Sequence, residues 1–306
     1  MGAVKVLTEA DWRPLAEAHA ARVDRLVGPH LARRADQVRH PVHDFLFTYY
    51  SQRPAQLRRW HPGVGTALAD APEHAGFKGY APLVEEGGAV TVAAPYVASQ
   101  RPLIARLHAL LGATASRAPQ LGCFGLHEWA MVHRAAEHGG PRHAWPLRLG
   151  QTGTDAVVES HRIACSHFDA YRFFTPSARG LNTLSPGRDD REAFEQPGCL
   201  HAGMDLYKHA FRLSPMVPSD LVADCFELAW DIRTLDMRAA PYDFSGVVLD
   251  HTGEEWTPVR IETTEGKAAY VAAQRGFAER AAPLRSRLVE ECERLLATGT
   301  GGAQNS

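Results

Sequence analysis

The pattern of apolar and polar positions along the chain is mainly helical. Apolar residues recur every three or four positions in several stretches, and this spacing puts them on one face of a helix. The helices predicted in this way cover residues 15–31, 99–111, 120–137, 199–213, 219–238 and 264–296. Two further short helical segments, separated by Pro54, are predicted between residues 43 and 60. The fold class indicated is mainly α (α+β).

Strand character is confined to a few places. The segments that have it are Thr91–Val97, 155–169, and a hairpin of 247–249 and 259–261 around Thr252-Gly253. The Gly-, Pro- and Ala-rich stretch 62–88 is predicted to be a loop. Because the chain has no internal repeat and no low-complexity linker, we expect a single globular domain. This helical domain, with a few short strands or hairpins, should cover residues 1–296 and be followed by a disordered tail at 297–306.

The charge balance does not point to a nucleic-acid or membrane partner. The 306 residues carry a formal net charge of −2, so no global basic field attracts the chain to phosphates. No run approaches the roughly 18 apolar residues of a membrane span. The N-terminal stretch reaches acidic residues too soon for a signal peptide, and five scattered cysteines never form C-x-x-C. Reduced thiols in a cytoplasmic protein are therefore expected.

The first candidate for chemistry is the segment LGCFGLHEWAMV, residues 121–132. Apart from His127 and Glu128 it is apolar or glycine, and a helix that is apolar on all sides is usually buried. A buried carboxylate needs a charged partner, a metal ion or a raised pKa. A structural ion pair between Glu128 and an arginine explains this pattern as well as a functional carboxylate does.

The second candidate is ESHRIACSHFDAYRFF, residues 159–174. If this segment is a strand, alternate side chains share one face. That face would gather the ligand-type or acid–base side chains of Glu159, His161, Cys165, His167 and Asp169, followed by Tyr171 and Arg172. A solvent-facing strand would also show polar alternation, so both interpretations stay open.

The third candidate is the predicted helix CLHAGMDLYKHAFR, residues 199–212. His201 and Asp205 lie one turn apart on it, which suits a metal ion or a substrate, although a plain amphipathic helix has the same pattern. Its C-x-H beginning repeats the C-x-H at 165–167, and two Cys with two His can form a tetrahedral zinc site. A mixed His and carboxylate site for iron, manganese or zinc is equally compatible.

Other motifs narrow the choice of reaction. The predicted helix 219–238 carries four acids on one face, for which a solvated surface is the ordinary explanation. Asp236 and Arg238 at its end, with Tyr242 and Asp243 after it, leave the helix where a site could be lined. The sequence contains no G-x-S-x-G, no P-loop, no G-x-G-x-x-G after a strand and no H-E-x-x-H. Serine hydrolases, kinases and dinucleotide-dependent enzymes are therefore disfavoured.

Four blocks resemble a bacterial, mainly actinobacterial, family commonly labelled 3-methyladenine DNA glycosylase. They are HDFLFTYYSQRPAQLRRWHPG, HFDAYRFFTPSARGLN, EQPGCLHAGMDLYKHAF and DCFELAWDIRTLDMRAAPYD. The resemblance implies hydrolysis of the N-glycosidic bond of an alkylated or modified base, with DNA as a partner. It also implies that the P-G-V-G of residues 62–65 belongs to a helix-hairpin-helix that binds a DNA phosphate. Asp169 or Asp205 would then stabilise oxocarbenium-like charge, and aromatic side chains would stack on a flipped base.

Two enzymatic readings remain, and they share most of their residues. One is the N-glycosylase, and the other is an enzyme that uses one divalent ion, zinc, iron or manganese, on a small molecule. The predicted catalytic residues are Glu128, Asp169 and Asp205. The predicted metal ligands are His127, His167 and His201. The predicted substrate-binding residues are Trp129, Tyr171, Arg172, Tyr207, Lys208 and Arg238. A non-enzymatic ligand-binding or scaffold protein has no specific support in the residues.

Overall fold

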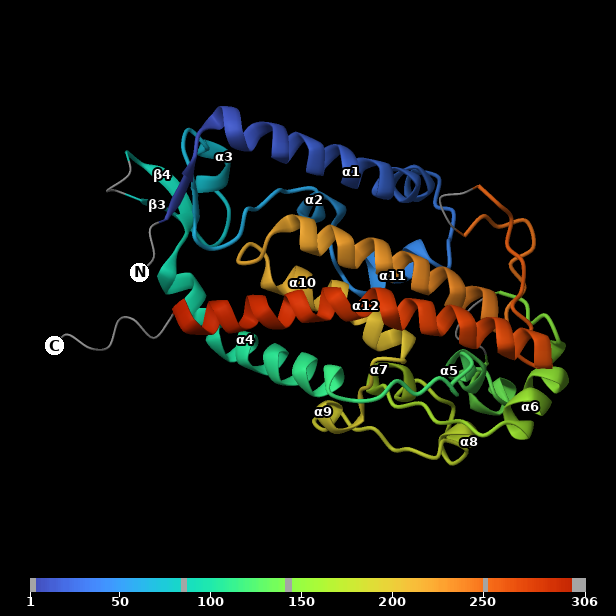
Figure 1. The fold of residues 1–306 in the computed structure, drawn as a ribbon. Coiled ribbons are helices and arrows are strands. Elements are labelled where there is room, and N and C mark those ends of the chain that lie inside the picture. The colour runs from blue at the N-terminus through green and yellow to red at the C-terminus, as the bar shows by residue number, and fades with distance from the viewer. Residues whose placement is uncertain (1–3, 84–86, 141–144, 250–252, 299–306) are drawn as a thin grey trace.

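Long helices form the body of the molecule (Figure 1), and the computed structural model describes residues 4–83, 87–140, 145–249 and 253–298. The long helices are α1 (Glu9–Ala35), α4 (Ala94–Ala115), α10 (Leu200–Leu213), α11 (Ser219–Ala239) and α12 (Thr264–Thr298). Helix α11 packs against α10, α12 and α1, and α4 packs along α12. The expected mainly α fold is confirmed.

Short helices complete the helical part. They are the π-helix η1 (Phe45–Tyr49), α2 (Pro54–Leu57), α3 (Pro72–Ala75), α5 (Leu126–Ala130), the 3-10 helix η3 (Ala135–His138), α6 (Gly150–Ser160), α7 (Phe168–Tyr171), α8 (Pro176–Arg179) and α9 (Arg191–Phe194). Figure 1 shows α5 to α9 gathered on the side of α10 and α12 that faces away from α1. Loops between these short helices therefore cover one side of the central helices.

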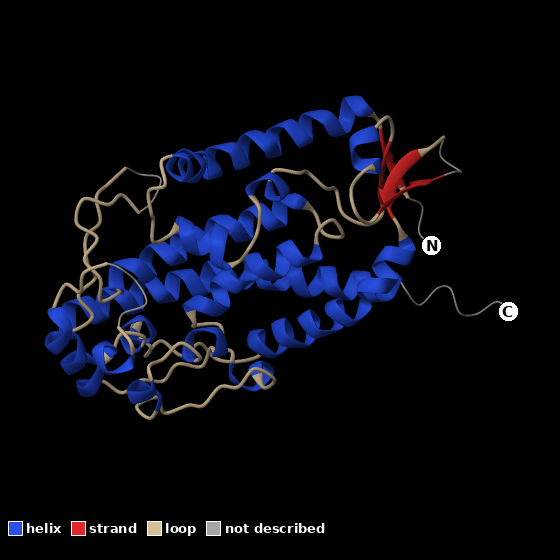
Figure 2. Cartoon of the chain, turned by 180° about the vertical axis from the view of Figure 1, so that it is seen from behind, coloured by secondary structure: helices blue, strands red, loops and turns tan. Residues whose placement is uncertain are grey.

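A small four-stranded sheet lies at one end of the molecule, far from most of the short helices (Figure 2). Its strands are β1 (Lys5–Leu7), β2 (Thr66–Leu68), β3 (Tyr80–Leu83) and β4 (Ala89–Val92), in the order β1-β2-β4-β3. Strand β1 is parallel to β2, and β4 is antiparallel to β2 and β3. The indole of Trp12 donates a hydrogen bond of 2.9 Å to the Ala69 carbonyl and so ties α1 to the sheet.

The acidic stripe of α11 lies at the surface and is matched by arginines of the flanking helices. Arg22 of α1 contacts Asp224 at 2.9 Å and Glu227 at 2.8 Å, and Arg287 of α12 contacts Asp224 at 2.9 Å. The rest of α11 is largely buried. Because repulsion between the acids is offset by partners on both neighbours, the stripe has a structural explanation.

The prediction of one continuous helix over residues 120–137 is wrong. Only Leu126–Ala130 and Ala135–His138 are helical. Phe124 has φ 47° and Arg134 has φ 47°, which is left-handed backbone that interrupts a right-handed helix on both sides of α5. The predicted burial of this segment is nevertheless confirmed, because every residue of α5 is buried.

The prediction of a strand over residues 155–169 is also wrong. Residues up to Ser160 belong to helix α6, and an irregular stretch leads from there to α7. Thr154, Val157 and Val158 are all buried, and this i, i+3, i+4 spacing fits one helical face. Adjacent valines point to opposite faces of a strand, so a strand with one face in solvent would have buried only one of them. The shared strand face proposed for Glu159 to Asp169 therefore does not exist.

Helix boundaries elsewhere range from accurate to clearly wrong. Helices α10, α11 and α12 match their predictions to within two residues at each end, and Pro54 begins α2. In contrast, the predicted strand Thr91–Val97 ends at Val92, and α4 begins at Ala94 rather than near Ser99, because a proline at residue 95 fits the first turn of a helix.

Two predicted loop regions are also corrected. The stretch 62–88, predicted as a loop, contains β2, α3 and β3. Of the predicted hairpin, the described residues keep a single pairing between Val248 and Glu255, and 259–261 form no strand. Thr252 and the tail residues 299–306 lie outside the described residues, while 297 and 298 still belong to α12.

Among the described residues, none of the helices combines the length and the apolar character that crossing a membrane requires.

Candidate functional site

Three buried side chains from three separate segments converge in the core. His127 comes from α5, His201 from the first turn of α10, and Asp236 from the last turns of α11. The Nε2 atom of His127 lies 3.0 Å from Oδ1 of Asp236, and the rings of His127 and His201 meet edge to face with centroids 4.5 Å apart. One donor atom from each residue lies within 4.8 Å of the other two.

An arginine holds the carboxylates of this site in place. Arg233, one turn before Asp236 on α11, donates to Oδ2 of Asp236 at 2.6 Å and to Glu128 at 2.7 Å. Its guanidinium also lies 4.3 Å above the ring of Phe45. The remaining oxygen of Asp236, Oδ1, is left to face His127. The ion pair of Glu128 with an arginine, one of the two explanations open from the sequence, is therefore present.

Burial and charge act in opposite directions on these groups. Burial alone would lower the pKa of His127, but the adjacent Asp236 carboxylate raises it well above its ordinary value. Burial would raise the pKa of Asp236, yet His127 and Arg233 hold it below its usual range. Burial and the nearby His127 lower the pKa of His201 well below its ordinary value. His201 is therefore neutral, with a lone pair available to a ligand.

A second charged cluster lies beside the first and includes His167. Its Nε2 atom is 3.4 Å from Asp205 and 3.5 Å from Glu195. Arg191 contacts Asp205 at 2.8 Å, and Lys208 contacts it at 3.2 Å. The rings of His167 and His201 lie 5.2 Å apart, so the two clusters meet at His201. Burial would raise the pKa of Asp205, but Lys208 and His167 hold it well below its ordinary value.

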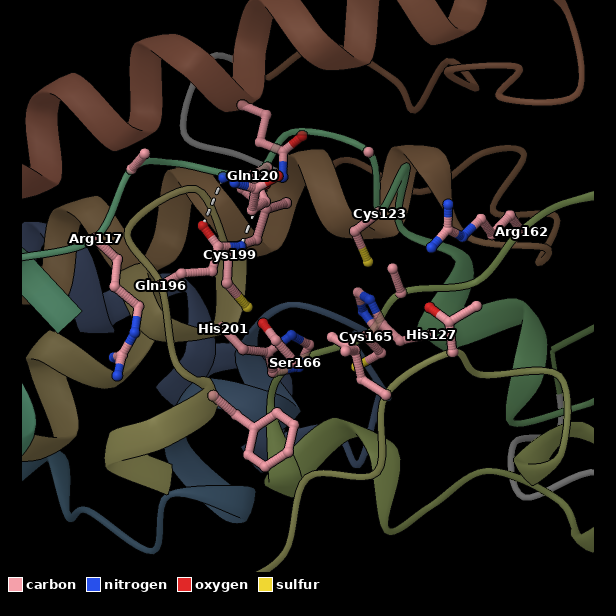
Figure 3. Close-up of a pocket in the computed structure, with 18 of the residues that line it drawn as sticks. Arg117, Gln120, Cys123, His127, Arg162, Cys165, Ser166, Gln196, Cys199 and His201 are labelled. Carbon is pink, nitrogen blue, oxygen red and sulfur yellow. Dashed lines mark hydrogen bonds between the residues drawn. The ribbon is translucent and has the colours of Figure 1, made fainter. Parts of the chain in front are cut away.

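Two cavities share His201 as a wall residue. The first, of about 520 Å³, is also lined by His127, three cysteines and Tyr270. Figure 3 shows the side chains of Cys123, Cys165, Cys199 and both histidines gathered around it. The second cavity, of about 510 Å³, is walled by aromatic rings, namely Phe45, Tyr49, Trp145, Phe173, Tyr242 and Phe244. A group bound at the histidines is thus reached from the first cavity.

The three predicted metal ligands are brought together, but in two clusters. His127 and His201 share donors with Asp236, whereas His167 faces Asp205 and Glu195. The tetrahedral arrangement of two C-x-H pairs is not formed, because the only compact donor group among the described residues is His127, His201 and Asp236.

The three predicted catalytic carboxylates occupy different positions. Glu128 and Asp169 line the second cavity. Asp205 lines neither cavity and accepts hydrogen bonds from Tyr50 at 3.0 Å and from Arg191 and Lys208. The Asp205 carboxylate is therefore occupied by the side chains of Arg191, Lys208 and His167 and does not face a cavity.

Of the predicted substrate-binding residues, none is among those that line the two cavities. Trp129 is in the core, where its indole donates to the Ala239 carbonyl at 2.9 Å, and the ring of Tyr207 is fully buried against Phe226. Lys208 bridges Asp169 and Asp205. Arg172 pairs with Asp169 at 3.2 Å and bonds to Tyr49. Tyr171 packs on Phe174 and Arg238 bonds to Thr257, both outside the clusters.

Sequence reasoning missed Arg233 and Cys123 as site residues, and it placed Asp236 where a site could be lined without assigning it as a ligand. A signal for Asp236 was present, because it lies four residues after Ile232 and so falls on the apolar side of α11, opposite the acidic stripe. A carboxylate on the buried side of a helix needs a partner. For Cys123 the sequence carried no such signal, since a buried thiol is usually a small hydrophobic group.

The P-G-V-G segment does not have the surroundings of a helix-hairpin-helix. It lies between the end of α2 and strand β2, so no helix follows it directly. The N–H of Val64 donates to Met216 at 3.0 Å, and its carbonyl accepts from Arg294 at 3.1 Å. These backbone groups are already used within the fold and are not free for a phosphate.

No protein-family model, curated protein or solved structure matches this chain. What the site can do chemically therefore follows from the geometry of its residues alone.

Proposed function

We propose that this chain is a metal-dependent enzyme that acts on a small molecule in the cytoplasm, with His127, His201 and Asp236 as ligands of one divalent ion. The observation that carries the proposal is the convergence of three buried donor atoms within 4.8 Å of one another. A structural His–Asp ion pair needs no second histidine, so His201 is the residue that favours a metal.

The donor set fits a catalytic rather than a structural metal. Two imidazoles and one carboxylate suit zinc, iron or manganese, and three protein ligands leave further coordination positions open. Two of the three ligands line the first cavity, so the open positions face space that a substrate can enter. Arg233 binds the second oxygen of the Asp236 carboxylate and so orients it, as residues that hydrogen-bond to metal ligands commonly do.

A bound divalent ion would supply Lewis acidity toward a substrate oxygen or a bound water. The chain itself contributes position and exclusion of bulk water. Arg233 fixes Asp236, and the neutral ring of His201 separates the two cavities. Metal binding must displace a proton from the His127 ring, whose pKa the adjacent Asp236 carboxylate raises, so we expect affinity to fall at low pH.

Elemental analysis tests this proposal. We expect the untagged protein, reconstituted and then freed of excess metal, to retain about one equivalent of zinc, iron or manganese. His201→Ala should lose it with little damage to the fold, because within the described part of the chain the His201 ring makes no hydrogen bond and contacts the rings of Phe45, His127 and His167. As a matched control, His133→Ala should keep it, because His133 is equally buried but bonds to Ser177, outside the cluster. Wild-type protein that holds no metal, or a His201→Ala variant that binds as tightly, would contradict the proposal.

A second candidate function uses a thiol nucleophile. The Cys123 sulfur points toward His127 from the first cavity (Figure 3), and the His127 ring is oriented by Asp236. A thiol, an imidazole and a carboxylate in this order can attack an electrophilic carbon. Phe124, the next residue, has the left-handed backbone that often accompanies functional turns. This candidate function is incompatible with a bound metal, because the metal and the thiol mechanism both need the ring nitrogen of His127 and the carboxylate oxygen of Asp236.

Alkylation separates the two candidates. If the thiol is the nucleophile, iodoacetamide should modify Cys123 faster than the other cysteines in metal-free protein at neutral pH, and His127→Ala should slow it at least tenfold. Cys225, buried and outside both cavities, is the internal control. Equal rates in wild type and His127→Ala, measured by mass spectrometry, would remove the thiol candidate.

The glycosylase reading stays a prediction with less geometric support. Its aspartates, Asp169 and Asp205, are engaged by Lys208, and its hairpin lacks a following helix. Base release from alkylated DNA would bring it back into consideration.

A further inference from the structure

The first cavity is lined by basic and neutral groups only. Among the described residues that line it there are two arginines, two histidines and several amides, hydroxyls and thiols, but no aspartate or glutamate. A cleft of one charge sign with apolar walls concentrates ligands of the opposite sign. We propose that this cavity binds a small organic anion, a carboxylate or a phosphate, and that this is the substrate class of the site.

Arg117 and Arg162 supply the charge from two sides of the cavity (Figure 3). The guanidinium of Arg117 is held by carbonyl oxygens, those of Ala113 at 3.0 Å, Glu195 at 2.9 Å and Glu192. Carbonyl partners fix its position but leave its charge unneutralised. Arg162 makes no hydrogen bond or ion pair within the described part of the chain, so its fork is free to take a carboxylate or phosphate.

A buried amide gives independent evidence for a ligand. Gln274, whose exposed fraction is 1%, lines the cavity and donates from Nε2 to the Gly198 carbonyl at 2.6 Å. That bond fixes its orientation and leaves Oε1 buried without a hydrogen-bond partner among the described residues. Buried acceptors of this kind are rarely left unpaired. A ligand that carries a hydroxyl or amide N–H besides its anionic group would satisfy it.

The wall that carries these groups is rigid. Gln196 accepts hydrogen bonds from the backbone N–H of Gln120 at 2.9 Å and of Gly198 at 2.7 Å, and it donates to the Gln120 carbonyl at 3.2 Å. These bonds connect the segment after α4 to the segment before α10, and Figure 3 shows some of them as dashed lines. This wall of the cavity, against which Gln274 is bound, is therefore preformed next to His127 and His201.

The experiment compares an anion with its neutral isostere. Succinate and succinamide are titrated calorimetrically into metal-free protein at low salt, and inorganic phosphate is titrated in parallel. We expect succinate to bind at least tenfold more tightly than succinamide, which is the gain typical of charge-assisted hydrogen bonds. Arg162→Gln should abolish most of this preference. Arg188→Gln, an exposed arginine that lines neither cavity, should leave it unchanged.

Each outcome bears on one proposal. Equal affinities for succinate and succinamide, or an anion preference that survives both Arg162→Gln and Arg117→Gln, would overturn the anion site. Phosphate bound more tightly than succinate would support it and assign the phosphate source. Turnover of an anion rests on the proposed metal centre, but binding to metal-free protein does not. If the protein binds a full equivalent of metal but shows no preference for the anion, the metal centre is supported and the anion site is not. If it binds the anion but no metal, the anion site is supported and the metal centre is not.

Discussion

Replacing Arg233 by methionine should lower the free energy of unfolding by about 3–5 kcal/mol, which is typical of the removal of one partner from a buried ion network. Arg233 is 6% exposed and donates at 2.7 Å to Glu128 and at 2.6 Å to Asp236, which are both buried. Methionine can fill much of the volume over Phe45, but it leaves Glu128 without its cation and Asp236 with His127 as its remaining charged partner. The measurement is the midpoint of urea unfolding at constant slope.

Two controls separate the loss of charge from the loss of a side chain. Arg280→Met removes a surface partner of Asp231, and should cost less than about 1 kcal/mol because exposed pairs contribute little. Adding Glu128→Gln to Arg233→Met should recover part of the lost stability, because one of the uncompensated charges is removed. A loss below about 1 kcal/mol in Arg233→Met would mean that the two carboxylates find protons or water, and that the network is not held by this arginine.

Charge placement explains why the two clusters can exist in the core at all. Asp236 and Glu128 are matched by Arg233 and His127, while Asp205 and Glu195 are matched by Arg191 and Lys208. Each cluster is close to neutral, which offsets the desolvation of its members. Such networks are weak evidence for stability, and apolar residues would fill the same space at less cost. Their concentration around His201, where two cavities meet, favours a chemical role.

Helices α10, α11 and α12 could be predicted closely because their own residues decide them, whereas the helix predicted over 15–31 extends from Glu9 to Ala35 and the one predicted over 99–111 extends from Ala94 to Ala115. Helix α10 has alternating apolar and polar stripes over its whole length, and α12 keeps its apolar spacing for many turns. The short elements could not. Residues 120–137 are broken by left-handed backbone at Phe124 and Arg134, and neither residue type signals that conformation. Tertiary contacts determine the backbone conformation at these residues, so local propensity does not predict it.

The candidate site was only partly predictable for the same reason. Burial of His127 followed from its apolar surroundings, and His201 followed from its place on α10. Their partner Asp236 was obscured by four other acids on α11, because only the helical phase separates it from them. Most of the other residues that line the first cavity come from segments with no regular structure, such as 162–166. Spacing along the chain carries no information about how such segments meet.

Acid should destabilise this protein well above the pH at which carboxylates titrate. Burial lowers the pKa of His40 to about 4, and the pKa values of His61 and His209 to about 3. In the unfolded chain a histidine has a pKa near ~6.5, so between that pH and the lowered values the unfolded state binds more protons. Stability is therefore fully present above pH ~6.5 and is lost as the pH falls.

The geometry around His40 shows why the neutral ring is required. Its Nε2 donates to the Val248 carbonyl at 2.7 Å, and its Nδ1 accepts from the N–H of His43 at 3.1 Å. Protonation of Nδ1 would place two donors face to face. Each such histidine costs about 1.4 kcal/mol per pH unit, so His40, His61 and His209 together account for about 4 kcal/mol per pH unit once the pH is well below 6.5.

Most of a typical domain stability of about 5–15 kcal/mol should therefore be lost by a pH of roughly 5. The opposite shifts of His127 and Asp236 do not blur this window. A histidine with a raised pKa contributes constant stability below pH ~6.5, and an aspartate with a lowered pKa contributes constant stability above pH ~4.

Urea unfolding between pH 7.5 and 5, with chelator present so that metal release makes no contribution, measures the slope. His40→Gln should reduce that slope by about 1.4 kcal/mol per pH unit, whereas His108→Gln, at an exposed pair with Glu293, should not change it. A free energy of unfolding that stays level from pH 7.5 to 5 would mean that these histidines find protons and water in the folded state, and that the core around them opens at little cost.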